Sequence, residues 1–178
     1  VKKKDIVSKQ KDLVRSEKIT IDKTVSIAST APGALTQNNF YGLRVEDKEI
    51  SLNIPDVVNV VGVFESLNTA APSFDKLTFI SGLNLDTASV LGEKIIGSQS
   101  RAIAQLTERS SATQVEIVYL TESKFIPGES VTFEESNITS TIQAITLGIH
   151  LDISDRFTLD KGHKEQYLDY SKIVRSAG

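Results

Sequence analysis

The segment LGEKIIGSQSRAIAQL, residues Leu91–Leu106, is repeated without gaps as PGESVTFEESNITSTI, residues Pro127–Ile142. Three positions are identical in the two copies and three more are apolar in both: Gly92/Gly128, Glu93/Glu129, Ser100/Ser136, Ile95/Val131, Ala102/Ile138 and Leu106/Ile142. Each copy predicts a Gly-Glu turn, a short strand, a polar turn and a second strand, which together make a β-hairpin. Two copies are too few for a solenoid. The repeat therefore predicts two hairpins packed into one small β-sandwich or barrel, and the pattern does not distinguish between these.

Other segments with strand patterns lie on both sides of the repeat. Strands are predicted where apolar and β-branched residues alternate or cluster, at residues 19–27, 40–45, 49–54, 57–64, 77–80, 115–119 and 149–153. The run at 57–64 is rich enough in Val to predict a strand buried on both faces. The fold class is therefore mainly β. We divide the chain into a basic N-terminal arm at 1–18, a β-rich region at 19–90, the two-copy hairpin repeat at 91–146, and a C-terminal strand and helix at 147–178.

Both ends of the chain carry short helical patterns. Near the C-terminus, Tyr167, Tyr170 and Val174 share one helical face and Ile173 flanks it, which predicts a short C-terminal helix. Tyr suits an interface there, because it buries its ring while its hydroxyl finds a partner. A weaker pattern of the same period allows a helical N-terminal arm.

The composition limits the chemistry that these 178 residues can perform. There is no Cys, which excludes disulfides, thiolate zinc sites and cysteine nucleophiles. Hydrophobic residues make up 39% of the chain and the net charge is −3, as expected of a folded protein. No apolar run reaches the ~20 residues of a membrane-spanning helix, so no membrane partner is expected. The chain has no Met, not even at position 1, and we expect it to be a fragment of a longer protein.

Charge is unevenly distributed along the chain. Residues 1–18 hold seven basic and three acidic side chains, with Lys2, Lys3 and Lys4 at the start, and the rest of the chain is acidic. A basic arm on an acidic body suits an acidic neighbouring subunit or nucleic acid. The arm has no interleaved aromatic residues to stack on bases, so a protein partner is favoured over nucleic acid.

The two histidines are the residues from which a catalytic triad would draw its base. His150 lies in the alternating stretch Ile149–Ile153, and it is predicted to face solvent, opposite the apolar residues. His163 follows Gly162 at a predicted turn. Both are interpreted as structural residues.

The carboxylates do not form a recognisable site either. Glu134 and Glu135 are adjacent, so on a strand they would point to opposite faces. Asp152, Asp155 and Asp160 miss the oxygen spacing of an EF-hand loop. We therefore predict no catalytic residue, no metal site and no cofactor.

Two stretches resemble a known class of proteins. Residues Ile54–Ser66 (IPDVVNVVGVFES) and Arg156–Arg175 (RFTLDKGHKEQYLDYSKIVR) resemble segments of large virion structural proteins of tailed phages, notably contractile-tailed phages of marine cyanobacteria. The second stretch keeps a recurring pattern of those proteins at Asp160, Gly162, Tyr167, Asp169 and Tyr170. It departs from the pattern at His163, Lys164, Glu165 and Leu168. The resemblance implies a structural role in the baseplate, tail fibre or neck, with assembly in the host cytoplasm and a final location in the virion.

Three functional hypotheses follow from these observations. The first is a virion structural domain that contacts other virion proteins and forms a homo-oligomer in the particle. Its interface candidates are Tyr167, Leu168, Tyr170, Ile173, Val174, Lys2, Lys3 and Lys4. The alternative is a carbohydrate- or receptor-binding module of a tail fibre that contacts a host surface glycan, although there is no Trp to serve as a sugar platform. The third, a polysaccharide depolymerase, needs a carboxylate pair in a groove, and we predict that the chain is not an enzyme.

Overall fold

The computed structural model describes residues 16, 18–20, 48–68, 70–80, 82–163 and 169–176. Its elements in chain order are β1 (Glu49–Pro55), β2 (Phe64–Glu65), β3 (Asp75–Phe79), α1 (Leu85–Ala88), β4 (Lys94–Gly97), β5 (Ile103–Ser111), β6 (Gln114–Tyr119), β7 (Ser130–Phe133), β8 (Thr139–Thr146), β9 (Leu151–Asp152), the 3-10 helix η1 (Ser154–Arg156), β10 (Phe157–Asp160) and β11 (Tyr170–Arg175). The predicted mainly β fold is confirmed. The strand predicted at 40–45, all but the first two residues of the one at 19–27, and the N-terminal arm apart from residues 16 and 18 lie outside the described residues.

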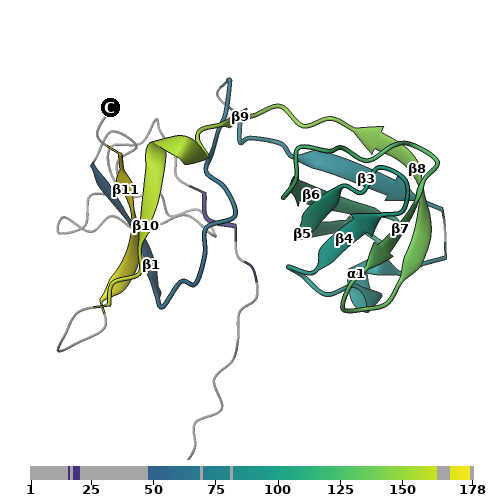
Figure 1. The fold of residues 1–178 in the computed structure, drawn as a ribbon, viewed down its shortest axis with the longest axis horizontal. Helices are drawn as coiled ribbons and strands as arrows, with labels where there is room; N and C mark the ends of the chain where they lie inside the picture. Colours follow the sequence, from purple (N-terminus) through teal and green to yellow (C-terminus); the bar gives the residue numbers. More distant parts are fainter. Residues whose placement is uncertain are drawn as a thin grey trace, which may run out of the picture.

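Six strands close into an antiparallel barrel in the order β3-β6-β5-β4-β7-β8, and β8 pairs with β3 to complete the circle. The barrel occupies one end of the molecule (Figure 1). Alternate side chains point inward, as the two-residue period of a strand requires. The core is built from Leu77, Phe79, Leu85, Ile95, Ala102, Ala104, Leu106, Val115, Ile117, Phe125, Val131, Phe133 and Ile142. The two copies of the repeat thus contribute four of the six strands, β4, β5, β7 and β8, and the fold is a barrel and not a sandwich, a choice that the sequence did not decide.

The two copies of the repeat form equivalent hairpins, β4–β5 and β7–β8, and these meet where β4 pairs antiparallel with β7. Their backbone hydrogen bonds correspond one to one. The Gly92 amide donates to the Leu106 carbonyl at 2.9 Å, and the Gly128 amide donates to the Ile142 carbonyl at 2.8 Å. Both glycines have positive φ, 85° and 89°, which explains why neither copy carries a side chain there. The hairpins are therefore related by an approximate twofold axis.

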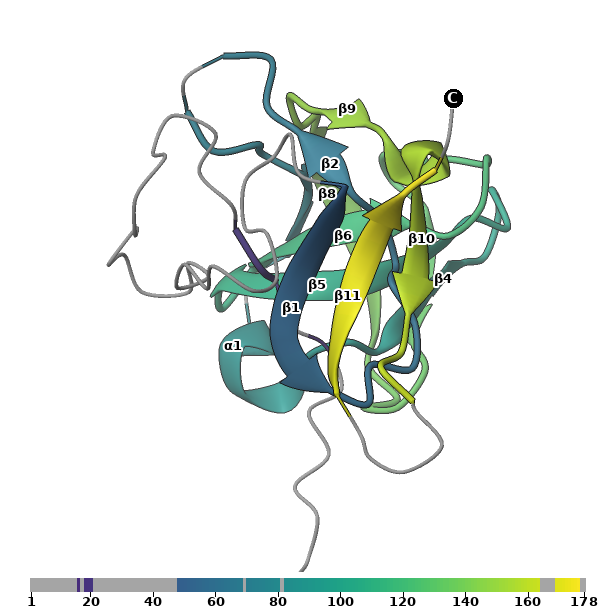
Figure 2. The same ribbon diagram turned by 90° about the vertical axis from the view of Figure 1, so that its left-hand side faces the viewer.

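A second, smaller sheet has the order β1-β11-β10, so it is built from segments on both sides of the barrel. Figure 2 shows these three strands side by side at the other end of the molecule. Among the described residues, its core contains three buried apolar side chains, Ile50, Leu52 and Ile173. The barrel is thus inserted into a sheet that the two flanking parts of the chain make together.

The C-terminal helix was a wrong prediction over residues 170–175, which form strand β11. Ser171 and Ile173 are buried while Tyr170 is exposed, so the alternation is that of a strand. The Ser171 hydroxyl accepts a hydrogen bond from the Val57 amide at 3.0 Å and donates one to the Lys161 carbonyl at 3.1 Å. Pairing with both β1 and β10 therefore outweighs the helical spacing of the apolar residues.

The strand predicted at 57–64 is also wrong, because only its last residue belongs to a strand, β2. Val57, Val60 and Val63 pack against the core of the small sheet. Val58 is 75% exposed and Val61 is 37% exposed. Apolar contact therefore recurs every third residue in a segment that lies over the sheet without pairing to it.

We predict that truncation of equivalent core side chains in the two hairpins destabilises the barrel to a similar degree. Leu106→Ala and Ile142→Ala each remove a side chain with no exposed surface, and each should lower the free energy of unfolding by about 2–5 kcal/mol. Urea denaturation provides the measurement. The control Leu120→Ala truncates a side chain that is 42% exposed, and its effect should stay near 0.5 kcal/mol. Core variants as stable as this control would contradict the packing described.

Candidate functional site

Glu93 is a buried carboxylate that links the first hairpin to the turn of the second. Its Oε2 accepts hydrogen bonds from the amides of Glu135 at 3.1 Å and Ser136 at 2.9 Å. The Ser136 hydroxyl donates to it at 3.0 Å, and Oε1 accepts from the Val90 amide at 2.6 Å. Both carboxylate oxygens thus accept hydrogen bonds, and the side chain holds the turn after β7 against the start of the first hairpin.

Glu129 makes the same contacts in the opposite direction. Its Oε2 accepts from the amides of Gln99 at 3.2 Å and Ser100 at 3.1 Å, and its Oε1 accepts from the Ser100 hydroxyl at 2.9 Å. The Ile126 amide donates to Oε1 at 2.6 Å. Each hairpin therefore holds the other's turn. We call this pair of contacts the carboxylate clasp, made by Glu93 with Ser136 and by Glu129 with Ser100.

The clasp accounts for the Glu and the later Ser that are identical in the two copies of the repeat. It also assigns these glutamates a structural role. Burial raises the pKa of Glu129, but the hydrogen bonds from Ile126, Ser100 and Gln99 together lower it by more than burial raises it. The pKa therefore lies below its ordinary value. Glu129 is therefore ionised at neutral pH, whereas a general acid must keep its proton.

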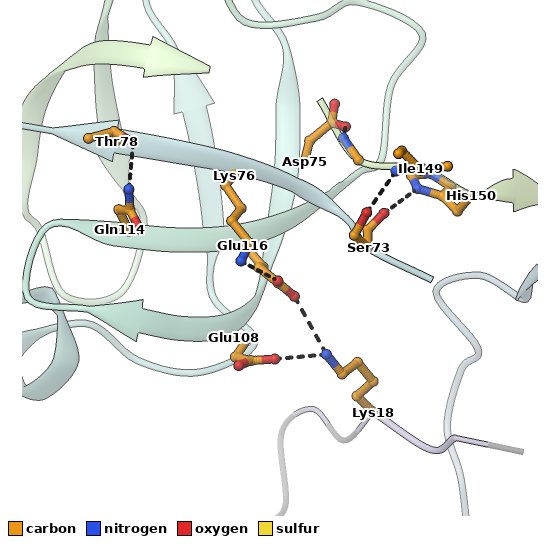
Figure 3. A network of polar contacts seen from close by, with 11 residues as sticks. Lys18, Ser73, Asp75, Lys76, Thr78, Glu108, Gln114, Glu116, Ile149 and His150 are labelled. Atoms are coloured by element: carbon orange, nitrogen blue, oxygen red, sulfur yellow. Dashed lines mark hydrogen bonds and ion pairs between the residues drawn. The ribbon is translucent and has the colours of Figure 1, made fainter. Parts of the chain in front are cut away.

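His150 is half-buried and its apolar neighbours Ile149 and Leu151 are exposed, so the faces predicted for this strand were reversed. Its ring packs edge-on against Phe64 at 5.1 Å between ring centroids and contacts Phe74 at 5.2 Å. Its Nδ1 lies 2.9 Å from the carbonyl oxygen of Ser73, which can only accept, so Nδ1 donates (Figure 3). Inward-facing His150 leaves Ile149 and Leu151 pointing out.

The result is an apolar stripe, defined as Leu147, Ile149 and Leu151, which runs from the end of β8 to the first residue of β9. These side chains are 76%, 58% and 42% exposed. The backbone fit explains their direction. A Cβ at Gly148 would collide with the carbonyl oxygen of Ser73, and the Gly148 amide donates to Asp75 Oδ1 at 2.7 Å. A shift of one residue would place a larger side chain where only glycine fits.

The remaining polar candidates are exposed or have structural contacts. His163 Nε2 lies 3.0 Å from Asp56 Oδ1 in an exposed pair. Asp152 accepts from the Ser154 amide at 2.9 Å, and Asp160 accepts from the Gly162 amide at 2.9 Å. Glu134 and Glu135 are exposed, in the turn that Glu93 holds, and Asp155 is exposed in η1. No three carboxylate or imidazole groups among the described residues converge to hold a metal ion.

The predicted interface residues are separated by the structure. Tyr170 is 44% exposed at the start of β11, and Val174 is half-buried on the same strand. Ile173 is only 5% exposed because it belongs to the core of the small sheet. Tyr167, Leu168, Lys2, Lys3 and Lys4 lie outside the described residues. The sequence did not predict the apolar stripe, because the alternating apolar residues of this segment were expected to face the core.

Comparison with known proteins gives no match to a family model, to a curated protein or to a solved structure. Among the described residues, no helix has the length and apolar character needed to cross a membrane. Inferences about function therefore depend on the geometry and on the resemblance found in the sequence.

We predict that neutralising one carboxylate of the clasp destabilises the barrel. Glu129→Gln replaces an acceptor oxygen by an NH₂ group facing the amides of Gln99 and Ser100 or Ile126, and should cost about 1–3 kcal/mol of unfolding free energy. Glu93→Gln should behave alike. The matched control is Glu134→Gln, at an exposed glutamate of the neighbouring turn. If urea denaturation gave the same free energy of unfolding for all three variants, the clasp would not stabilise the barrel.

The clasp should also make the stability of the barrel depend on pH. Because the pKa of Glu129 is lowered in the folded state, its ionised form contributes stability above the pKa of an unfolded glutamate, about 4.3. That contribution is lost as the pH falls through the lower folded-state pKa. The difference in melting temperature between wild type and Glu129→Gln should therefore be largest near neutral pH and shrink below about pH 4. A difference that grows on acidification would show the opposite sign of the shift.

Proposed function

We propose that this chain is a structural domain of a phage virion, in the tail, baseplate or a fibre, and that it mediates protein–protein assembly. The observation that carries the proposal is the apolar stripe. Three neighbouring large apolar side chains face solvent on a segment whose backbone fit prevents them from turning inward. Patches of this kind mark contact surfaces more often than isolated exposed apolar residues do.

The energetics of the stripe are sufficient for a specific contact. Full burial of a Leu or Ile side chain contributes roughly 1.5–3 kcal/mol, and these three are between about two fifths and three quarters exposed. Their combined burial would therefore contribute a few kcal/mol, which is a typical share of an interface's binding energy for its central residues. Partners are other virion proteins or further copies of the chain, and the protein resides in the virion after assembly in the host cytoplasm.

The rest of the site supports assembly over the sugar-binding alternative and over catalysis. The ring of Tyr119 is covered by Lys124, whose Nζ lies 3.8 Å from the ring centroid. Phe64 and Phe74 pack against each other and against His150. These rings are thus not presented as flat platforms for a sugar. Of the buried glutamates, Glu93 and Glu129 are used in the clasp and Glu116 is paired with Lys18 and Lys76. The proposal therefore assigns the chain no catalytic role and no cofactor.

The test is to place charge on the stripe and to measure assembly. Leu147→Glu combined with Ile149→Glu should reduce incorporation of the protein into virions by at least about tenfold, because the two lost contacts together contribute more than about 1.4 kcal/mol. Incorporation is measured by quantitative mass spectrometry of purified particles from cells that express the variant. Sedimentation of the purified chain tests self-association in parallel.

The matched control adds the same charge elsewhere on the barrel. Gln143 and Ala144 are exposed on β8, so Gln143→Glu with Ala144→Glu should assemble normally. Circular dichroism confirms that both variants are folded. Normal incorporation of the stripe variant would reject the stripe as the contact surface, and a wild-type chain that is absent from particles would reject the virion role.

A further inference from the structure

The barrel and the small sheet are joined by a narrow neck. In the part of the chain that the structure describes, two segments cross it, and they contact each other where Ser73 bridges to Ile149. Next to this bridge, Phe64 and Phe74 pack against the ring of His150. In the described part of the chain, barrel strands pair only with barrel strands. The relative orientation of the two parts therefore depends on contacts at the neck.

Lys18 provides a third connection from outside the neck. Its Nζ lies 2.7 Å from Glu108 Oε2 and 3.5 Å from Glu116 Oε2, on strands β5 and β6 of the barrel (Figure 3). The same ammonium group lies 5.6 Å from the centroid of the Phe74 ring. Lys18 thus contacts the barrel and the neck at once.

The next residue contacts the other part of the molecule. Ile19 packs against the apolar core of the small sheet, beside Ile50, Leu52 and Ile173. Two consecutive residues therefore contact opposite parts: Lys18 contacts the barrel by charge, and Ile19 contacts the small sheet by apolar packing. A strap of this kind resists rotation of one part against the other.

The carboxylates are suited to hold a cation from outside the barrel. Glu116 is largely buried, with 9% of its side chain exposed, and Lys76 Nζ lies 3.2 Å from its Oε1. The hydrogen bond from Lys18 lowers the pKa of Glu108, which keeps that carboxyl ionised. Lys76 lies on β3 and so belongs to the barrel itself, whereas Lys18 comes from a segment remote in sequence.

We propose that Lys18 and Ile19 form a latch that sets the orientation of the small sheet relative to the barrel, and that high ionic strength releases this latch. Exposed ion pairs are screened by salt, and the Debye length falls to about 3 Å at 1 M. Release leaves the barrel intact, because the latch adds nothing to its core. The latch is independent of the proposed function, since it concerns the geometry within one chain.

The test measures the distance between one spin label on each part of the molecule. The sequence has no Cys, so Gln143→Cys on β8 and Thr158→Cys on β10 provide the only two labelling sites. Double electron–electron resonance gives the distribution of distances. At low salt, a narrow distribution is expected for the labelled chain that keeps Lys18. A broader or shifted distribution is expected for Lys18→Met, and for the chain that keeps Lys18 in 1 M NaCl.

Two controls separate the latch from general effects of charge. Lys76→Met removes the other cation from Glu116 but leaves Lys18 in place, so its distribution should stay narrow. Lys18→Glu combined with Glu108→Lys reverses the charges of the shorter of the two Lys18 ion pairs. This double variant should have a narrower distribution than Lys18→Glu alone. Circular dichroism checks that each variant is folded. A distribution for Lys18→Met identical to the latched chain, or an equal broadening in Lys76→Met, would overturn the proposal.

Discussion

A carboxylate that is buried must be surrounded by hydrogen-bond donors, and in this protein that requirement ties the two halves of the barrel together. Glu93 takes donors from the turn after β7, and Glu129 takes donors from the turn after β4. Neither hairpin can satisfy its own glutamate, because the essential amides belong to the other copy. A half-formed barrel would hold an under-bonded buried charge, so we infer that the two hairpins form cooperatively. The twofold symmetry is then a consequence of this mutual dependence.

Closure of the barrel also determines how the rest of the chain can fold. A closed barrel has no strand edges, so the small sheet must be built from the segments that enter and leave it. Those segments emerge side by side, as the bridge between Ser73 and Ile149 shows. The entropy of bringing β1 next to β11 is therefore largely offset when the barrel forms. This explains how a sheet with three buried apolar residues in its core can persist.

The sequence predicted the parts of the fold that depend on local pattern and failed where tertiary contacts decide. The repeat predicted both hairpins, because their turns need Gly-Glu and their strands alternate. It did not predict the clasp, since only the pairing of β4 with β7 brings Glu93 to the other copy's turn. The apolar residues of Tyr170–Arg175 have helical spacing, yet this segment forms a strand that pairs with both β1 and β10. His150 was assigned to the wrong face because the polar side chain is the one that packs against two aromatic rings.

The reversal at His150 connects the fold to the proposed role. A strand has two faces, so a segment that must present Gly148 to a neighbouring carbonyl and His150 to two rings must expose the residues between them. Polar residues would satisfy that geometry at no cost in solubility, yet this chain places Leu and Ile there. The apolar side chains are thus not required by the internal packing of the described residues. We propose that another protein covers them, at the neck where Ser73 bridges to Ile149.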